Sequence, residues 1–469
     1  MLGDRRVRGS VCVPVVVSAF LLACPGIAGA QGQSFFQGSV PTGQATRTTL
    51  NLSLSDAFAR ALRYNLGGIE SQQNTRAARA VRLRSLNALL PDLAARVGAT
   101  LQQIDLRALG FFVSIPGVHT IVGPFGVADA RAYLSQEIFN WSDIKNWKSS
   151  AESERASQYT YRSDRDLVVL TAADAYLLVI TDAANVDSIR AQVNTAQTLY
   201  LNDVDLHQHG VIAAIDELRA HVELQTQQQR LIAAENELQI DKLSLARVIG
   251  LPNGQQFHLT DSVPYAPLAG VTLDEALQQA YATRPDYLSA KAQVRAAELA
   301  RQAASAENYP SLSTSTDFGD IGSPNFGTSH ETFDFALTLN IPVFQGTRVR
   351  ADKLQADSAL RQRRAELADL GGKIDDQVRA AFFNLTSSSE LVRVSESNVN
   401  LGNQTLAQAQ DRFKAGVADN LEVVQAQESV ASANQSYIAS VYSFNLAKIS
   451  LAQAIGVAEA SGLHYLGVR

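Results

Sequence analysis

The stretch FDFALTLNIPVFQG occupies residues 333–346 and alternates apolar with polar or small side chains. The apolar positions are Phe333, Phe335, Leu337, Leu339, Ile341 and Val343, and the side chains between the first five of them are Asp334, Ala336, Thr338 and Asn340. A period of two residues predicts a β-strand with one apolar face, and Pro342 ends the regular pattern. The sequence on either side of this strand predicts long helices. The fold therefore depends on what covers the apolar face of a strand in a mainly helical chain.

The composition favours a folded protein without a nucleic-acid partner. The chain has 469 residues, of which 46% are hydrophobic, and its formal charge is -6. Since neither sign of charge dominates, no basic surface for nucleic acid is expected. After residue 30 we find no run of about 18 apolar residues, so no transmembrane helix is expected.

The first 30 residues are expected to be a secretory signal peptide. Three arginines lie within residues 5–8, residues 11–23 form a short apolar core, and residues 28–30 offer small side chains for cleavage. A second interpretation is a lipoprotein signal, in which Cys24 is lipidated and becomes the first mature residue. Cleavage after residue 30 removes both Cys12 and Cys24, so it leaves a mature chain without thiol chemistry.

The chain is a tandem repeat of about 210 residues. LSLSDAFARAL (52–62) aligns with VTLDEALQQAY (271–281), and residues 205–250 align without a gap with residues 411–456. Two related halves predict two copies of the same set of elements.

Each repeat is expected to contain a capped first helix, two strands and two long helices. Ser53 and Thr272 are predicted N-caps with an acid three residues later, and the first helix is expected to run unbroken to Pro91 or Pro310. The expected division is a signal peptide (1–30), an N-terminal extension (31–51), repeat one (52–250), a linker (251–270), repeat two (271–456) and a C-terminal tail (457–469). The expected strands are residues 92–104, 130–139, 311–318 and 332–343, the expected loops 109–129 and 319–331, and the expected long helices 143–208, 211–249, 348–414 and 418–455.

The strands decide the class of protein. The helices carry narrow apolar stripes, which pack in coiled-coil seams and offer no broad surface to cover a sheet. Four strands do not close a barrel by themselves, whereas alternating segments of about 9–11 residues fit the tilted strands of an outer-membrane barrel. We therefore expect lipid to cover the apolar face, and several copies of the chain to close the sheet. The alternative is a periplasmic coiled-coil scaffold or adaptor that does not conduct.

Several motifs follow one another in repeat two: TLDEAL (272–277), NYPSL (308–312), LTLNIPVFQGTRVRA (337–351), QVRAAFFNL (377–385) and DRFKAGVADNLEVVQAQ (411–427). In this order, and duplicated, they resemble the TolC-type outer membrane efflux proteins. The resemblance implies a homotrimer, with a twelve-stranded β-barrel in the outer membrane of a Gram-negative-type bacterium above a twelve-helix periplasmic tunnel. It also implies an exit duct for drugs, ions or proteins, docked to a periplasmic adaptor and an inner-membrane pump of the RND, ABC or MFS class.

The resemblance places functional residues at the turns between the long helices. In the family, acidic side chains point into the tunnel just after the glycine turn, and the matching positions here are Glu422 and Gln425. Their equivalents in repeat one are Asp216 and Arg219, for which a solvated i,i+3 ion pair is the alternative. Three copies of Glu422 would form an acidic ring that attracts cations. Adaptor contact is expected at the turns themselves, at Gly210, Val211, Gly416 and Val417.

No enzyme activity, cofactor or metal site is expected. His207 and His209 are two residues apart on a helix, so their imidazoles point apart and do not readily share an ion. Neither a phosphate-binding nor a dinucleotide-binding fingerprint is present, and no nucleophile elbow is found.

Overall fold

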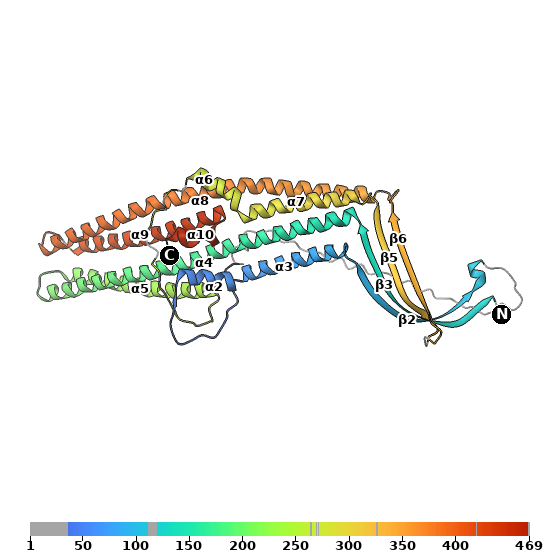
Figure 1. The fold of residues 1–469 in the computed structure, drawn as a ribbon. Helices are drawn as coiled ribbons and strands as arrows, with labels where there is room; N and C mark the ends of the chain where they lie inside the picture. The colour runs from blue at the N-terminus through green and yellow to red at the C-terminus, as the bar shows by residue number, and fades with distance from the viewer. Residues whose placement is uncertain are drawn as a thin grey trace, which may run out of the picture.

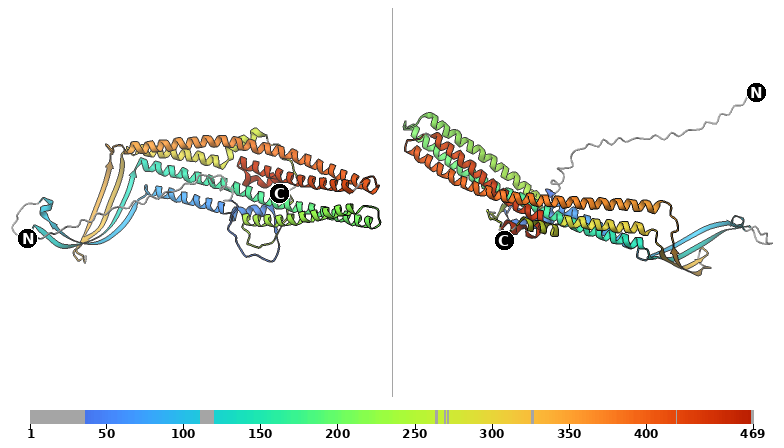
Figure 2. Two further views of the ribbon diagram at one scale, coloured as in Figure 1. Left: turned by 180° about the vertical axis from the view of Figure 1, so that it is seen from behind. Right: turned by 90° about the horizontal axis from the view of Figure 1, so that it is seen from above.

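The computed structural model describes residues 36–110, 120–262, 265–268, 270, 272–324, 327–418 and 420–467. A curved sheet lies at one end, and long helices run from it to the opposite end (Figure 1). Two further views show the same separation of sheet and helix ends (Figure 2). The predicted signal peptide and Cys24 lie outside the described residues.

The sheet joins the two repeats. Within the described residues its four antiparallel strands have the order β2-β3-β5-β6, so β3 of repeat one pairs with β5 of repeat two. The strand bounds are β2 Asp92–Asp105, β3 Ile121–Phe139, β5 Ser311–Gly322 and β6 His330–Asn340. A short 3₁₀ helix, η1 (Leu106–Leu109), follows β2.

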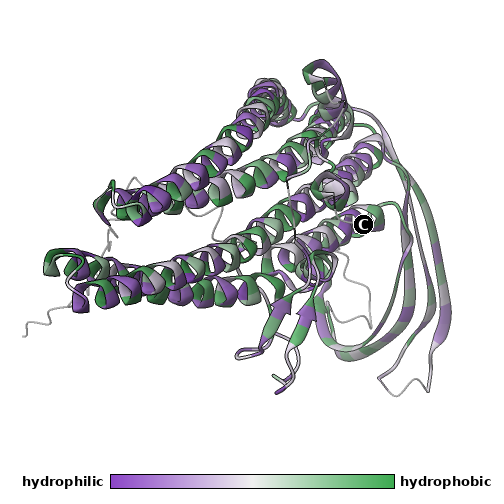
Figure 3. Cartoon of the chain, turned by 90° about the vertical axis from the view of Figure 1, so that its left-hand side faces the viewer, coloured by the Kyte–Doolittle hydropathy of each residue, from purple (hydrophilic) through white to green (hydrophobic). Residues whose placement is uncertain are grey.

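The strand register gives the sheet one apolar face. Leu93 lies opposite Leu134, Leu312 opposite Leu339, and Phe318 opposite Phe333, so apolar positions of neighbouring strands adjoin. Hydropathy alternates along each strand (Figure 3). The apolar side chains on this face are largely solvent-exposed in the single chain: Leu93, Val97, Leu101, Phe318, Phe333, Phe335, Leu337 and Leu339. The other face holds Arg131, whose guanidinium bonds the Asp129 and Asp317 carboxylates at 2.6 and 3.1 Å.

Three expected strand or loop limits are wrong. β3 begins at Ile121 rather than at residue 130, because residues 121–126 pair with the end of β2 across a bulge, which shortens the expected 109–129 loop. β5 continues to Gly322, which shortens the expected 319–331 loop. β6 ends at Asn340, before Ile341 and Val343: its partner strand starts at Ser311, directly after a proline that has no N–H to donate.

The helices of each repeat appear in the expected order. Those of repeat one are α2 Leu54–Tyr64, α3 Leu66–Asn87, α4 Trp141–Gln208 and α5 Ala214–Ile249. Those of repeat two are α6 Leu273–Thr283, α7 Pro285–Ala306, α8 Arg348–Lys414 and α9 Asn420–Ile455, followed by α10 Ala458–Leu466. A parallel pair of short strands, β1 Leu50–Leu52 and β4 Phe257–Leu259, ties the N-terminal segment to the linker. At about 1.5 Å per residue, the 68 residues of α4 span roughly 100 Å.

The first helix of each repeat is broken, contrary to expectation. The two predicted capping boxes, at Ser53 and Thr272, are confirmed. Asn65 then ends α2 with ψ 133 and caps α3 through its side chain, which accepts from the N–H of Gly67 at 2.9 Å. In repeat two the break falls at Arg284, which precedes Pro285 and is therefore disfavoured in the helical conformation.

One apolar segment of α4 was not predicted from the sequence. α4 contains an 18-residue window with mean hydropathy 1.8, long and apolar enough by composition to cross a membrane. Val168, Ala172 and Tyr176 of this helix are buried in the main core, and the Tyr176 hydroxyl donates to the main-chain oxygen of Leu52 at 3.0 Å. Since 39% of the window is buried, these core contacts account for part of its apolar character.

Candidate functional site

The helix tips are two matching turns at the end of the molecule opposite the sheet. One lies between α4 and α5 at residues 209–213, and the other lies between α8 and α9 at residues 415–418. Gly210 and Gly416 both have φ +71, which glycine tolerates best. The next residue donates its N–H back into the helix in each turn, Val211 to Leu206 and Val417 to Arg412. This is the Schellman arrangement, and it explains why both repeats carry glycine here.

The predicted adaptor-contact residues lie at the surface of these tips. Val211 is 67% exposed and Val417 is 70% exposed, so each tip ends in an apolar side chain with little protein around it. A Cβ added to either glycine would meet no atom within 4 Å. Both tips therefore have an accessible surface.

The predicted aperture residues form ion pairs that differ between the repeats. Asp216 and Arg219 make the i,i+3 pair at 3.1 Å. Glu422 instead reaches across the hairpin to Arg412 of α8, at 3.3 Å, a contact that sequence reasoning missed. Gln425 is exposed on the same helix. The charge of a Glu422 carboxylate is thus partly compensated within its own chain.

The two tip histidines bind different partners. Nδ1 of His207 lies 2.5 Å from Oε2 of Glu217 and links α4 to α5. Nδ1 of His209 lies 2.7 Å from the main-chain oxygen of Asp205, one turn earlier. Across the described part of the chain, no group of three or more His, Cys, Asp or Glu side chains is arranged to hold a metal ion.

A buried polar pair at the tips was missed by sequence reasoning. Asp203 of α4 accepts a hydrogen bond from Nδ2 of Asn420, the first residue of α9, and the two side chains are 0% and 1% exposed. Burial raises the pKa of Asp203 to about 6, and the carboxylates of Asp216 and Glu217 add to this shift. The sequence did contain a signal that Asp203 is buried. It lies at coiled-coil spacing from Val193 and Ala196, which are buried on the same helix.

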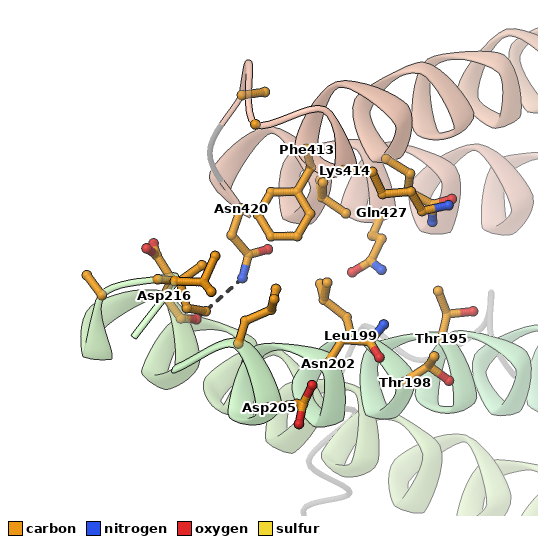
Figure 4. Close-up of a pocket in the computed structure, with 18 of the residues that line it drawn as sticks. Thr195, Thr198, Leu199, Asn202, Asp205, Asp216, Phe413, Lys414, Asn420 and Gln427 are labelled. Atoms are coloured by element: carbon orange, nitrogen blue, oxygen red, sulfur yellow. Dashed lines mark hydrogen bonds between the residues drawn. The ribbon is translucent and has the colours of Figure 1, made fainter. Parts of the chain in front are cut away.

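A pocket of about 1030 Å³ lies between the helix tips, beside this pair. Figure 4 shows Gln427 of α9 reaching toward Leu199 of α4, and a dashed line joins Asn420 to Asp216 of α5. The lining of this pocket includes amide, hydroxyl and carboxylate groups. Apolar side chains, among them Leu199, Leu206 and Phe413, line it as well, so the two hairpins meet at their tips across a space of mixed polarity.

The protein comparisons agree with this architecture. The profile of the family described as outer membrane efflux protein matches residues 69–251 and again residues 276–457, which confirms the duplication. The chain is 21% identical over 339 residues to the alkaline protease secretion protein AprF of Pseudomonas aeruginosa, covering 70% of each protein. It is 25% identical over 342 residues to the pyoverdine export outer membrane protein OpmQ of Pseudomonas putida, again covering 70% of each. The outer membrane protein TolC of Vibrio cholerae is 22% identical over 330 residues, covering 69% of this chain and 75% of TolC.

Solved structures share the fold. A membrane protein from Pseudomonas aeruginosa has a TM-score of 0.75 at 18% identity, covering 89% of this chain and 97% of its own. VceC from Vibrio cholerae has a TM-score of 0.73 at 16% identity, covering 86% and 96%. Fold and repeats together define a duplicated outer-membrane protein with a long helical extension. This chain belongs to the outer membrane efflux protein family.

Proposed function

We propose that the chain is the outer-membrane exit duct of an export system and that it works as a homotrimer. The observation that carries this proposal is the sheet, which is apolar on one face and ion-paired on the other. Within the described residues β2 and β6 each have one neighbouring strand, and an open edge in hydrocarbon would leave backbone groups unpaired. Pairing β6 of one copy with β2 of the next removes the edges, and three copies give twelve strands.

The two faces support one orientation of the sheet in the proposed barrel. Leu337, Leu339 and their neighbours face lipid, because exposed apolar side chains are stable there. The Arg131 cluster with Asp129 and Asp317 faces the water-filled lumen, where charged groups remain solvated.

The helices of three copies form the periplasmic tunnel, which narrows at the tips. Glu422, Gln425, Asp216 and Arg219 line this aperture, and the exposed tip residues around Val211 and Val417 bind a periplasmic adaptor. An inner-membrane pump of the RND, ABC or MFS class supplies the energy, so the chain itself is a passive conduit. The names of AprF and OpmQ indicate that related ducts serve protease secretion and pyoverdine export.

Planar-bilayer recording tests the proposal. The purified protein is expected to conduct ions, and Glu422→Ala is expected to conduct more because one barrier at the aperture is removed. Glu428→Ala, an exposed acid on the same helix, is the matched control and should resemble the wild type. If neither the wild type nor Glu422→Ala conducts at any voltage, the exit-duct proposal is wrong and a scaffold role becomes the better explanation.

A further inference from the structure

The Asp203–Asn420 pair joins the two repeats at the helix tips. Nδ2 of Asn420 bonds Oδ2 of Asp203 and also lies 3.4 Å from the main-chain oxygen of Asp216. Oδ1 of Asp203 and Oδ1 of Asn420 are both buried, and neither has a hydrogen-bond partner among the described residues. The pair therefore has two unused acceptor oxygens and no second donor to satisfy them. Leaving buried acceptors without a hydrogen bond costs free energy.

The charges packed around Asp203 make its ionised form unfavourable. From α5, Asp216 and Glu217 both face it and are negative. On α4 itself, His207 lies one turn after Asp203, and its Nδ1 is 2.5 Å from Oε2 of Glu217. Asp205, also on α4, is exposed to solvent.

The other repeat brings two cationic side chains near the tips, but neither forms an ion pair with Asp203. Arg412 of α8 is paired with Glu422 of α9 at 3.3 Å, and Lys414 lines the neighbouring pocket. In the described part of the chain, Asp203 takes part in no ion pair. Its burial is thus not compensated by a positive charge.

We propose that Asp203 is a proton-operated switch, whose protonated carboxyl holds α4 to α9 and keeps the tips closed, and whose deprotonation releases them. The proposal rests on the proposed exit-duct function. In the protonated state the proton is on Oδ1 of Asp203, and this O–H donates to the unused Oδ1 of Asn420. On deprotonation that O–H bond breaks and the proton passes to water in the adjoining pocket. The carboxylate then remains beside Asp216 and Glu217 until the hairpins separate and water solvates it.

The direction of the pH effect follows from the pKa. Burial raises the pKa of Asp203 from 3.8 to about 6, so the closed state binds more protons than an open state in which the carboxyl is solvated. Closure is therefore favoured below about pH 6 and lost as the pH rises through that value. If opening restores the ordinary pKa, the open-to-closed ratio of each chain rises about tenfold between pH 5 and pH 8.

Bilayer conductance at pH 5 and pH 8 tests the switch with matched variants. The wild type should open about tenfold more at pH 8. Asp203→Asn supplies a permanent N–H donor in place of the carboxyl O–H, so its conductance should stay low and nearly independent of pH. Asp205→Asn, two residues further on and exposed, should keep the wild-type response. A full pH response in Asp203→Asn overturns the proposal.

A second measurement separates failure of the switch from failure of the duct. Spin labels at the exposed tip positions Val211 and Val417 report the distance between the hairpins, with labelled chains diluted so that most assemblies carry one. The distance should increase from pH 5 to pH 8 in the wild type and not in Asp203→Asn. A distance that does not change in the wild type refutes the switch, even if the protein conducts. A distance that changes in a protein without conductance refutes the duct and supports the switch.

Discussion

Replacing Gly456 with alanine is expected to destabilise the protein much more than replacing Gly416. Both glycines follow a long helix of repeat two, and both have left-handed backbones, with φ +82 and +71. A Cβ at Gly456 would lie 2.7 Å from the Cα of Arg284 and 3.1 Å from its nitrogen. A Cβ at Gly416 would meet no atom within 4 Å. Both substitutions thus incur the cost of a left-handed backbone, and only Gly456→Ala also incurs a steric clash.

The magnitudes can be worked from these contacts. The left-handed conformation costs alanine about 1 kcal/mol at either site. At Gly456 the obstacle is backbone, so the start of α7 must move away from the end of α9. That movement strains two hydrogen bonds across the junction, Arg284 Nη1 to Ala454 O at 3.2 Å and Thr283 Oγ1 to Ile455 O at 2.7 Å, each worth about 1 kcal/mol. Gly456→Ala should therefore cost about 3 kcal/mol, and Gly416→Ala about 1 kcal/mol.

Denaturant unfolding of the detergent-solubilised protein measures both free energies of unfolding. Gly416→Ala is the control for the backbone penalty, because its environment is open. If the two variants differ by less than about 0.5 kcal/mol, the close approach of α7 to the end of α9 does not constrain Gly456 and the reasoning is refuted.

Three further predictions concern other parts of the molecule. Burial raises the pKa of the Asp166 carboxyl to about 6, so wild-type stability should increase as the pH falls from 8 to 5, and Asp166→Asn should flatten that dependence in unfolding experiments at both pH values. Leu337→Lys places a charge on the lipid-facing side at a cost of about 2–4 kcal/mol and should lower the yield of folded protein in the membrane, whereas Thr338→Lys on the opposite face should not. Arg412→Ala removes the cation 3.3 Å from Glu422, so reversal potentials in a salt gradient should show stronger cation selectivity; unchanged selectivity would place Glu422 away from the ion path.

Local patterns predicted most of the fold. The strand at β6 follows from strict alternation, and the helix starts at Ser53 and Thr272 follow from capping boxes of four residues. The duplication then transferred each interpretation to the other repeat, including the glycine turns at Gly210 and Gly416. These features depend on residues that are close together in the chain, so they can be recognised from the sequence without knowledge of the fold.

The missed features depend on contacts between distant segments. The break at Asn65 is stabilised by its side-chain amide, which donates to Phe36 O, 29 residues away. The start of β3 is determined by pairing with β2 across a bulge, at a Gly-Pro step that interrupts the alternation. The Asp203–Asn420 pair joins residues 217 apart, in different repeats. Helical spacing relates Asp203 to the buried positions Val193 and Ala196, but only the folded chain supplies its partner.

The number of chains in the purified particle is the sharpest test of the proposed trimeric barrel. Native mass spectrometry of the protein released from detergent measures that number without reference to cargo or pump. We expect three chains, because three four-stranded sheets close a barrel without an exposed edge in hydrocarbon. A single chain, or two chains with the sheet edges still open, would contradict it.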